Sequence, residues 1–249
     1  MKALITGASS GIGREMAKVL SVKGYDLIIT ARREDRLEKL RAELGTNVKV
    51  IKADLSKEDE CFRLYEAVKD ENIDILINSA GFGIFGAFDK TDLGRELDLI
   101  NVDIKALHIL TKLFYKDFKK RDSGYILNIA SSAAFQPGPL LSSYYAAKAY
   151  VLHLTEALTE ELRRSGSAVY IGALCPGPVA TEFDSVANVK FSLKNLSAEY
   201  VAGYAIDKMF KRKTVIIPGT AMKLAVFAER FLTRKFVVKT AYTFQRRKG

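Results

Sequence analysis

A tyrosine and a lysine four residues apart, Tyr144 and Lys148, form the pair in this sequence that is best suited to proton transfer. In a helix this spacing puts both side chains on one face. A neighbouring ammonium group favours the phenolate, so it lowers the pKa of a tyrosine from ~10 toward neutral pH and suits the hydroxyl to general acid catalysis. The same spacing also occurs at Tyr65/Lys69, Tyr115/Lys119 and Tyr204/Lys208, so the spacing alone is a weak signal.

The surrounding sequence distinguishes Tyr144 from the other three tyrosines. A strand-like run at 125–130 precedes it and ends at Ser131 and Ser132. Because open α/β sheets bind ligands outside the carboxyl ends of their strands, hydroxyl groups at this position are well placed for a site. We interpret Tyr144 and Lys148 as the proton-transfer pair, with the hydroxyl groups of Ser131 and Ser132 at the strand end beside it. The other three pairs are interpreted as parts of amphipathic helices with solvated lysines.

A glycine-rich segment is suited to binding a phosphate group. Thr6-Gly7-Ala8-Ser9-Ser10-Gly11-Ile12-Gly13 lies between an apolar run at 2–6 and a helical pattern at 11–23. Glycines let the backbone turn tightly and approach a pyrophosphate, and the N–H groups and dipole at the start of a helix favour an anion. The spacing is G-x-x-x-G-x-G rather than G-x-G-x-x-G, and three glycines also fit an ordinary turn. The position between strand and helix favours nucleotide binding.

The end of the second strand-like run indicates which nucleotide binds. A carboxylate at this position accepts hydrogen bonds from the 2′-OH of the adenosine ribose, whereas an arginine accommodates a 2′-phosphate. The sequence has Arg32 and Arg33 there, and Glu34 and Asp35 come only at the start of the next helical pattern. Cations at the start of a helix are disfavoured by its dipole, so a phosphate partner explains them better than solvent does. We therefore expect NADP rather than NAD.

The hydrophobic pattern predicts the elements that position these groups. Strand-like runs lie at 2–6, 26–30, 48–52, 73–78, 125–130, 168–174 and 215–217. Helical patterns lie at 11–23, 34–44, 57–71, 91–121, 143–165 and 197–211. This alternation predicts an α/β fold, a Rossmann-type doubly wound parallel sheet of about seven strands with helices on both faces. We expect one catalytic domain at 1–219 and an extension at 220–249, with helical spacing over 221–232 and a strand-like end.

Composition excludes several classes of protein. The chain has 249 residues, of which 48% are apolar and 27% charged, as in globular proteins and unlike disordered, collagen-like or coiled-coil chains. No stretch approaches the roughly 18–20 apolar residues of a membrane-spanning helix, and the first residues do not resemble a secretory signal. Two cysteines, Cys61 and Cys175, and two histidines, His108 and His153, are too few for a disulfide framework or a structural zinc site. We expect a cytoplasmic protein without a metal.

The positive charge is concentrated near the C-terminus. The formal net charge is +10, and residues 190–249 hold 14 basic and three acidic side chains, a balance of 14 − 3 = +11, which leaves −1 for residues 1–189. Three interpretations of this basic end remain open: a helix that packs on the domain or on a second subunit, a peripheral contact with an anionic membrane, and nucleic-acid binding. We favour the first, since the cations lack a nucleic-acid-binding motif, although apolar residues at helical spacing between cations also suit a membrane.

Taken together, the motifs resemble the compact NADP-dependent branch of the short-chain dehydrogenase/reductase family, from residue 2 to about residue 219. The elements that carry the resemblance are the turn at 6–13, Asp54-Leu55 after the third strand, Asn78-Ser79-Ala80-Gly81, Asn101 in a helix, Ser131 at 13 residues before Tyr144, and Pro176-Gly177-Pro178-Val179-Ala180-Thr181. Two positions depart from the family pattern. Ser79 replaces the second residue of an Asn-Asn-Ala-Gly element, and Ala134 stands where many members have glycine.

The resemblance implies a role for each matched residue. Ser131 would hold the substrate carbonyl, Tyr144 would transfer the proton, and Lys148 would lower the pKa of Tyr144 and bind the nicotinamide ribose. Asn101 would hold a water that links Lys148 to solvent. The implied cofactor-binding residues are Gly7, Ser9, Ser10, Gly11, Ile12, Gly13, Arg32, Arg33, Asp54, Leu55, Asn78, Ala80, Gly81, Tyr144, Lys148, Pro176, Gly177, Val179 and Thr181.

The implied function is NADPH-dependent interconversion of a carbonyl compound and an alcohol. A non-catalytic NADP-binding regulatory protein on the same fold is the alternative, but it has no need of the Ser/Tyr/Lys arrangement. The segments 133–142 and 182–196 are rich in apolar residues, which favours an apolar ketone or aldehyde, or a 3-oxoacyl or 3-hydroxy acid type of compound. Other candidates for the pocket, or equally for core packing, are Phe82, Phe85 and Phe88. The family also implies a homodimer or homotetramer.

Overall fold

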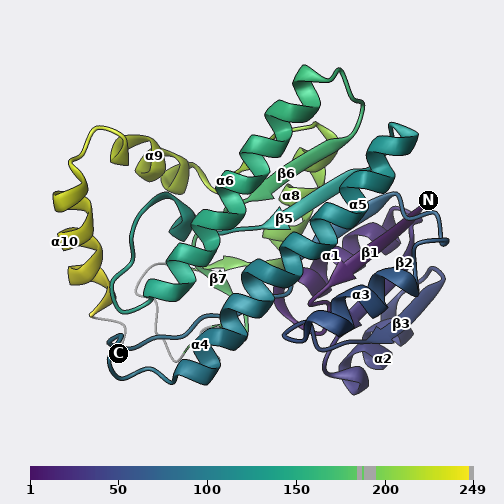
Figure 1. Cartoon of the computed structure of the whole chain (residues 1–249), viewed down its shortest axis with the longest axis horizontal. Helices are drawn as coiled ribbons and strands as arrows, with labels where there is room; N and C mark the ends of the chain where they lie inside the picture. Colours follow the sequence, from purple (N-terminus) through teal and green to yellow (C-terminus); the bar gives the residue numbers. More distant parts are fainter. Residues whose placement is uncertain (184–186, 188–194, 247–249) are drawn as a thin grey trace.

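Seven parallel strands form the central sheet in the computed structural model of the chain (Figure 1), in the order β3-β2-β1-β4-β5-β6-β9. The structure describes residues 1–183, 187 and 195–246. The strands are β1 (Lys2–Thr6), β2 (Asp26–Ala31), β3 (Val48–Lys52), β4 (Ile75–Asn78), β5 (Tyr125–Ile129), β6 (Tyr170–Leu174) and β9 (Val215–Ile216). The strand order reverses between β1 and β4, where doubly wound sheets bind their ligands. The predicted fold class is confirmed.

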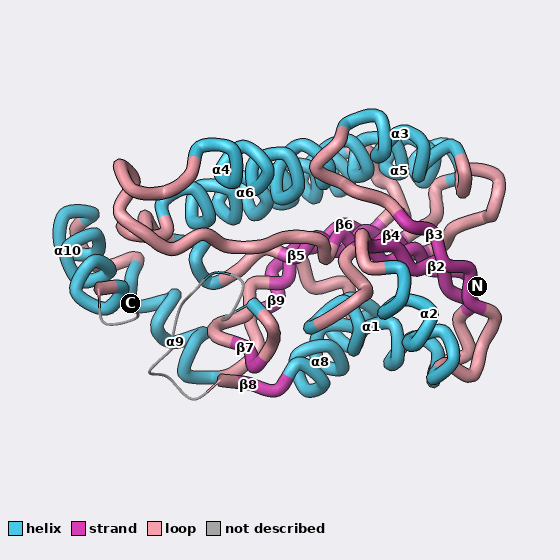
Figure 2. Tube along the Cα trace, turned by 90° about the horizontal axis from the view of Figure 1, so that it is seen from below, coloured by secondary structure: helices cyan, strands magenta, loops and turns pink. Residues whose placement is uncertain are grey.

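Helices cover both faces of the sheet (Figure 2). One face carries α1 (Gly11–Val22), α2 (Glu34–Glu43) and α8 (Ala198–Phe210), and the other carries α3 (Glu58–Glu66), α4 (Leu93–Ile100), α5 (Leu107–Arg121) and α6 (Ser142–Arg164). Successive side chains of a strand point to opposite faces. In β1, Ala3 and Ile5 pack with α1, α2 and α8, whereas Leu4 packs with α3 and α5. Burial on both faces is the reason that these strands are almost wholly apolar.

The helical pattern predicted at 91–121 is divided into three parts. Helix α4 ends at Ile100, a π-helical turn η1 (Asn101–Ala106) follows, and α5 begins at Leu107. Such π-helical turns are frequent at functional sites. Within this turn the charged side chain of Asp103 is fully buried. The interruption therefore brings a carboxylate into the interior at the carboxyl edge of the sheet.

The chain beyond residue 219 forms two helices, α9 (Thr220–Glu229) and α10 (Arg234–Gln245), which project at one end of the molecule (Figure 1). The prediction of a strand-like end after residue 232 is wrong. Thr233 caps α10 by accepting a hydrogen bond from the Phe236 N–H, and Val237, Ala241 and Gln245, spaced four residues apart, are buried on one face. Packing of this face outweighs the strand propensity of its aromatic and β-branched residues.

Short elements complete the carboxyl edge of the sheet. A 3-10 turn η2 (Ser132–Phe135) follows β5, and β7 (Val179–Ala180) pairs in parallel with β8 (Leu196–Ser197), a pairing that was not predicted. Of the predicted substrate segment 182–196, Val186, Val189 and Phe191 lie outside the described residues. Among the helices that the structure describes, none is long and apolar enough to cross a membrane.

Candidate active site

A cavity of about 740 Å³ lies along the carboxyl ends of the strands. The predicted site residues that line it are Gly7, Ser9, Ser10, Gly11, Ile12, Arg32, Arg33, Asp54, Leu55, Ala80, Gly81, Ser131, Tyr144, Lys148, Pro176, Gly177, Val179 and Thr181. Three predicted site residues do not line it: Gly13, Asn78 and Asn101. The tyrosines of the other three Tyr/Lys pairs also lie elsewhere: Tyr115 is buried in the core, Tyr65 donates to Asp117, and Tyr204 accepts from Lys223.

The glycine-rich turn is fitted closely against the neighbouring chain. Gly7 has a φ of +67°, and a Cβ there would lie 2.7 Å from the backbone of Ala80 after β4. A Cβ on Gly13 would lie 2.7 Å from the Gly7 carbonyl oxygen, so Gly13 supports the turn from behind the cavity. Because α1 starts at Gly11, its first N–H groups lie beside this turn, an arrangement that suits a phosphate.

Arg33 is held against the turn by hydroxyl groups. One of its Nη atoms donates to Ser10 Oγ at 2.9 Å and to Ser9 Oγ at 3.2 Å, and the other donates to Glu182 Oε2 at 2.8 Å. Glu182 also pairs with Arg36, and hydrogen bonds from Arg33 and Arg36 lower the pKa of its carboxyl. Sequence reasoning missed Glu182, which comes from a distant loop. A phosphate bound here would compete with Glu182 for Arg33.

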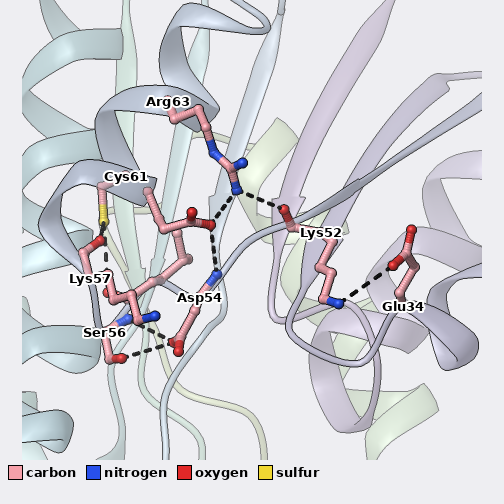
Figure 3. Close-up of polar contacts among 9 residues, drawn as sticks. Glu34, Lys52, Asp54, Ser56, Lys57, Cys61 and Arg63 are labelled. Carbon is pink, nitrogen blue, oxygen red and sulfur yellow. Dashed lines mark hydrogen bonds and ion pairs between the residues drawn. The ribbon is translucent and has the colours of Figure 1, made fainter.

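Asp54 is held by its own local turn (Figure 3). Its Oδ1 accepts hydrogen bonds from the Ser56 N–H at 3.2 Å and the Ser56 hydroxyl at 2.9 Å, and its N–H donates to Glu60 Oε2 at 3.3 Å. Arg63 in turn contacts Glu60 and the Lys52 carbonyl oxygen. These contacts fix the direction of the segment after β3, where Asp54 and Leu55 form one end of the cavity wall.

Ser131, Tyr144 and Lys148 meet in the middle of the cavity wall. Ser131 caps η2, and its Oγ accepts a hydrogen bond from the Ala133 N–H at 3.1 Å. Tyr144 and Lys148 lie near the start of α6, with Lys148 Nζ 5.6 Å from the centroid of the Tyr144 ring. Lys148 is buried and donates to the Ile129 carbonyl oxygen at 3.1 Å. Ser132 also lines the cavity, and its N–H donates to the Pro176 carbonyl oxygen.

The pKa of Tyr144 is raised above its ordinary value of 10.0. Burial is the largest cause, and it outweighs the lowering by Lys148 and by the Ser131 hydroxyl. Lys148 thus lowers the pKa of Tyr144 as we predicted from the Tyr/Lys spacing, but desolvation disfavours the phenolate more strongly and the net shift is upward. With this pKa, Tyr144 is protonated at neutral pH.

Asp103 is the partner of Lys148 that sequence reasoning missed. Its Oδ1 lies 2.6 Å from Lys148 Nζ, and its Oδ2 accepts a hydrogen bond from the Phe82 N–H at 3.0 Å. A Cβ on Gly81 would lie 2.7 Å from Asp103 Oδ1, so a glycine is needed for this approach. Burial lowers the pKa of Lys148, but Asp103 and Tyr144 raise it more, so the net shift is upward.

Asn101 stands at the start of the π-helical turn that carries Asp103. We had predicted that Asn101 would be the residue linked to Lys148 through a water, but Asp103 makes the direct contact with Lys148. The relay role of Asn101 stays a prediction. The signal that could have identified Asp103 is a single carboxylate two residues after Asn101 within an apolar helical stretch.

Removing the Asp103 carboxylate should destabilise the fold, since it leaves the Lys148 ammonium buried without its partner. We expect Asp103→Leu to reduce the free energy of unfolding by about 3–5 kcal/mol, measured by urea denaturation. The double variant Asp103→Leu/Lys148→Met removes both charges and should recover most of that loss. An equal or larger loss in the double variant would contradict the pairing.

Asn78 joins the strands beneath the cavity instead of lining it. Its Nδ2 donates to Asn128 Oδ1 at 2.9 Å and to Thr111 Oγ1 at 3.1 Å, and Asn128 donates to Thr155 at 3.0 Å. All four side chains are buried. This network ties β4 and β5 to α5 and α6, and so it positions the strand ends that carry the site.

The C-terminal helices close the other end of the cavity. Its lining includes Met222 and Val226 from α9 and Val237, Ala241 and Gln245 from α10. Gln245 is buried and donates to the Tyr145 hydroxyl. The Met222 side chain lies against Gly177, where a Cβ would be 2.6 Å from Met222 Cε. The inner face of the C-terminal extension therefore packs on the domain.

The three phenylalanines that we proposed for the pocket have different environments. Phe82 lines the cavity. Phe85 packs in a small cluster with Leu141 and Phe183, next to the Tyr144 ring. Phe88 is 71% exposed. Only one of the three candidates therefore lies on the cavity wall.

Comparison with known proteins identifies similar sequences and folds. The family model described as short chain dehydrogenase matches residues 1–190. An uncharacterized oxidoreductase of Staphylococcus epidermidis is 37% identical over 183 residues, covering 72% of this chain and 78% of its own. The very-long-chain 3-oxoacyl-CoA reductase of Anas platyrhynchos is 30% identical over 198 residues, covering 76% of this chain and 63% of its own.

Two solved structures have the same architecture, and each matches a larger share of this chain than the two related sequences do. A short-chain dehydrogenase from Sphingobium yanoikuyae in complex with NADPH has a TM-score of 0.83 and 32% identity, covering 92% of this chain and 93% of its own. The bulky-bulky ketone specific alcohol dehydrogenase from Comamonas testosteroni has a TM-score of 0.78 and 28% identity, covering 92% of each chain.

Proposed function

Because this chain belongs to the short-chain dehydrogenase family, we propose that it is an NADPH-dependent oxidoreductase that interconverts a carbonyl compound and an alcohol. The observation that best supports this function is the shared cavity, in which Ser131, Tyr144 and Lys148 face the same space as the glycine-rich turn and Arg33. When bound, the nicotinamide supplies or accepts the hydride, while the protein supplies orientation and electrostatics.

In this proposal each polar group of the site has a defined role. Tyr144 donates its proton to the substrate oxygen as that oxygen becomes an alkoxide, and it takes the proton back in the oxidative direction. Ser131 donates a hydrogen bond to the same oxygen and holds it near Tyr144. Lys148, held by Asp103 and the Ile129 carbonyl oxygen, binds the nicotinamide ribose hydroxyls and lowers the pKa of Tyr144 relative to an equally buried tyrosine.

Two observations support NADP as the cofactor. Arg32 and Arg33 line the cavity beside the glycine-rich turn, and the end of β2 carries no carboxylate. A related structure, that from Sphingobium yanoikuyae, is a complex with NADPH. Arg33 is the more suitable of the two for a 2′-phosphate, since Ser9 and Ser10 hold its guanidinium at the mouth of the turn.

We also infer an apolar substrate. The walls beyond Tyr144 are formed mainly by apolar side chains: Phe82, Leu141, Phe183, Met222, Val226, Leu232 and Val237. Related proteins are named for bulky-bulky ketones, for very-long-chain 3-oxoacyl-CoA and for 17-beta-hydroxysteroids. As in the family, we place the reaction in the cytoplasm and expect a homo-oligomer formed through α5 and α6.

A direct test is NADPH oxidation, followed by loss of NADPH absorbance, against a panel of aldehydes, ketones, quinones and 3-oxoacyl thioesters. We expect turnover with apolar members of the panel and little with small polar ones. Silence across the whole panel, in a preparation that binds NADPH, would overturn the proposed catalysis.

A further inference from the structure

Helix α9 has apolar side chains on two opposite faces. Met222 and Val226 line the cavity on the inner face. On the outer face Leu224 and Phe227 are 68% and 57% exposed, Phe231 in the turn directly after the helix is 75% exposed, and no described part of the chain covers them. The Phe227 and Phe231 rings pack edge to face with their centroids 5.4 Å apart. Large side chains of this kind, gathered on one surface, mark an interaction site.

The same two helices carry an excess of positive charge. We call residues 220–246 the tail hairpin. It contains six basic residues and one acidic residue, Glu229, so its formal charge is 6 − 1 = +5. Within the described part of the chain none of its cations forms an ion pair: Lys223 donates to the Tyr204 hydroxyl, and the exposed Arg230, Arg234, Lys235, Lys239 and Arg246 have no acidic partner. Apolar rings and unpaired cations therefore occur side by side on one protruding element, at the end of the molecule (Figure 2).

The cavity reaches the surface through the tail hairpin. Leu232, Phe236 and Phe244 line the cavity, yet they are between 47% and 58% exposed. The apolar lining thus continues from the cavity wall to the outside of the hairpin, and Glu229, Thr240 and Gln245 are the polar side chains that the hairpin adds to it. A water-soluble substrate would gain little from such an opening, whereas a lipophilic one could remain in apolar surroundings along the whole path.

We propose that the tail hairpin docks on an anionic lipid membrane surface, with the outer face of α9 in the interfacial region and the exposed cations at the lipid headgroups. An amphipathic helix with aromatic residues on one side and flanking cations is suited to this position. A second copy of the chain fits less well. A two-fold symmetric contact through this face would bring the +5 charge of one hairpin against that of the other.

Leu232, Phe236 and Phe244, the exposed part of the cavity lining, belong to the same hairpin, so the proposal places this end of the cavity near the lipid. A lipophilic carbonyl compound dissolved in the membrane then reaches Tyr144 without crossing water. This consequence for the substrate rests on the proposed function, whereas docking itself does not. Vesicle binding is measured without cofactor or substrate, so failure of one proposal can be told from failure of the other.

The first experiment measures tryptophan fluorescence. Because the chain contains no tryptophan, one introduced tryptophan reports only on its own surroundings. Phe227→Trp puts a single fluorophore on the outer face of α9, and Phe88→Trp puts one on an exposed surface elsewhere as the control. Phosphatidylcholine vesicles that contain phosphatidylglycerol should shift the emission of Phe227→Trp to the blue and leave that of Phe88→Trp unchanged. Unchanged emission in Phe227→Trp would overturn the proposal.

The second experiment separates the contributions of rings and charges by co-sedimentation with the same vesicles. Arg234→Gln/Lys235→Gln should weaken binding roughly 25-fold, since each cation near an anionic surface contributes about fivefold. Phe227→Ser/Phe231→Ser should weaken it by at least about tenfold. The controls Lys23→Gln/Lys39→Gln and Phe88→Ser, which alter exposed residues outside the hairpin, should bind as the parent chain does.

If the tail hairpin instead contacts a second copy of the chain, the same variants should give a different result. If Phe227→Ser/Phe231→Ser converts an oligomer to a monomer in sedimentation velocity, and vesicle binding by the parent chain is absent, the hairpin is a subunit contact and the membrane proposal is wrong. Binding to phosphatidylcholine alone as tight as to the anionic mixture would also contradict it, because the cations would then have no part.

Discussion

Tyr144→Phe is expected to lower the turnover number with a carbonyl substrate by roughly a thousandfold, which lies within the range for loss of a positioned general acid. The ring remains, so its contacts with Phe183 and Tyr145 are kept and the fold should be unchanged. The affinity for NADPH should change little, because the hydroxyl acts on the substrate oxygen. Initial rates and NADPH titration of the same preparation measure the two effects.

The chain offers two matched controls for this variant. Tyr145→Phe removes a neighbouring cavity hydroxyl that bonds to Gln245, and Tyr204→Phe removes the tyrosine of another Tyr/Lys pair. Both should keep most of the activity. If Tyr144→Phe retained a substantial fraction of wild-type turnover, the assignment of Tyr144 as proton donor would be wrong.

The raised pKa of Tyr144 also predicts the direction of the pH dependence. Tyr144 can donate a proton only while it is protonated, and burial keeps its pKa above 10.0 in the protein without cofactor. The rate of reduction should therefore be level through neutral pH and fall only at alkaline pH. A rate of reduction that rises as the pH increases would indicate that another group donates the proton.

Replacing Arg32 and Arg33 with glutamine is the second change with a large expected effect. We expect the dissociation constant for NADPH to rise on the order of a hundredfold, because a charge-assisted contact with a phosphate contributes about 1.5–3 kcal/mol. Affinity for NADH should change little, since NADH has no 2′-phosphate. Titration of the double variant with NADPH and with NADH measures the change in each dissociation constant. Equal losses of affinity for the two nucleotides would show that these arginines do not bind the 2′-phosphate.

Neighbouring charges provide the controls for this second prediction. Arg36 pairs with Glu182 and does not line the cavity, so Arg36→Gln should have a much smaller effect on NADPH. Glu182→Gln removes the carboxylate that Arg33 now contacts at 2.8 Å. The NADPH affinity of that variant should increase, because the phosphate no longer competes with Glu182 for the guanidinium.

Most strands could be predicted because their sequence signal is local. Residues such as Ile28 and Ile77 lie in short apolar runs whose burial on both faces needs no knowledge of distant parts of the chain. The helix at 91–121 was harder to predict. Its hydrophobic period continues through the π-helical turn at 101–106, so the period does not reveal that the helix is interrupted there. The end of the tail was predicted wrongly, since Val237 and Val238 favour a strand in isolation but pack as a helix.

The sequence by itself determined the alternation of strands and helices, the glycine-rich turn at Gly7 and Gly11, and the pairing of Tyr144 with Lys148 on one helix face. These features depend on residues within a few positions of each other. Only the tertiary structure brought Glu182 to Arg33, 149 residues away, and Asp103 to Lys148. It also decided that the basic tail closes the cavity, because burial and charge pairing between distant residues depend on how the finished elements pack.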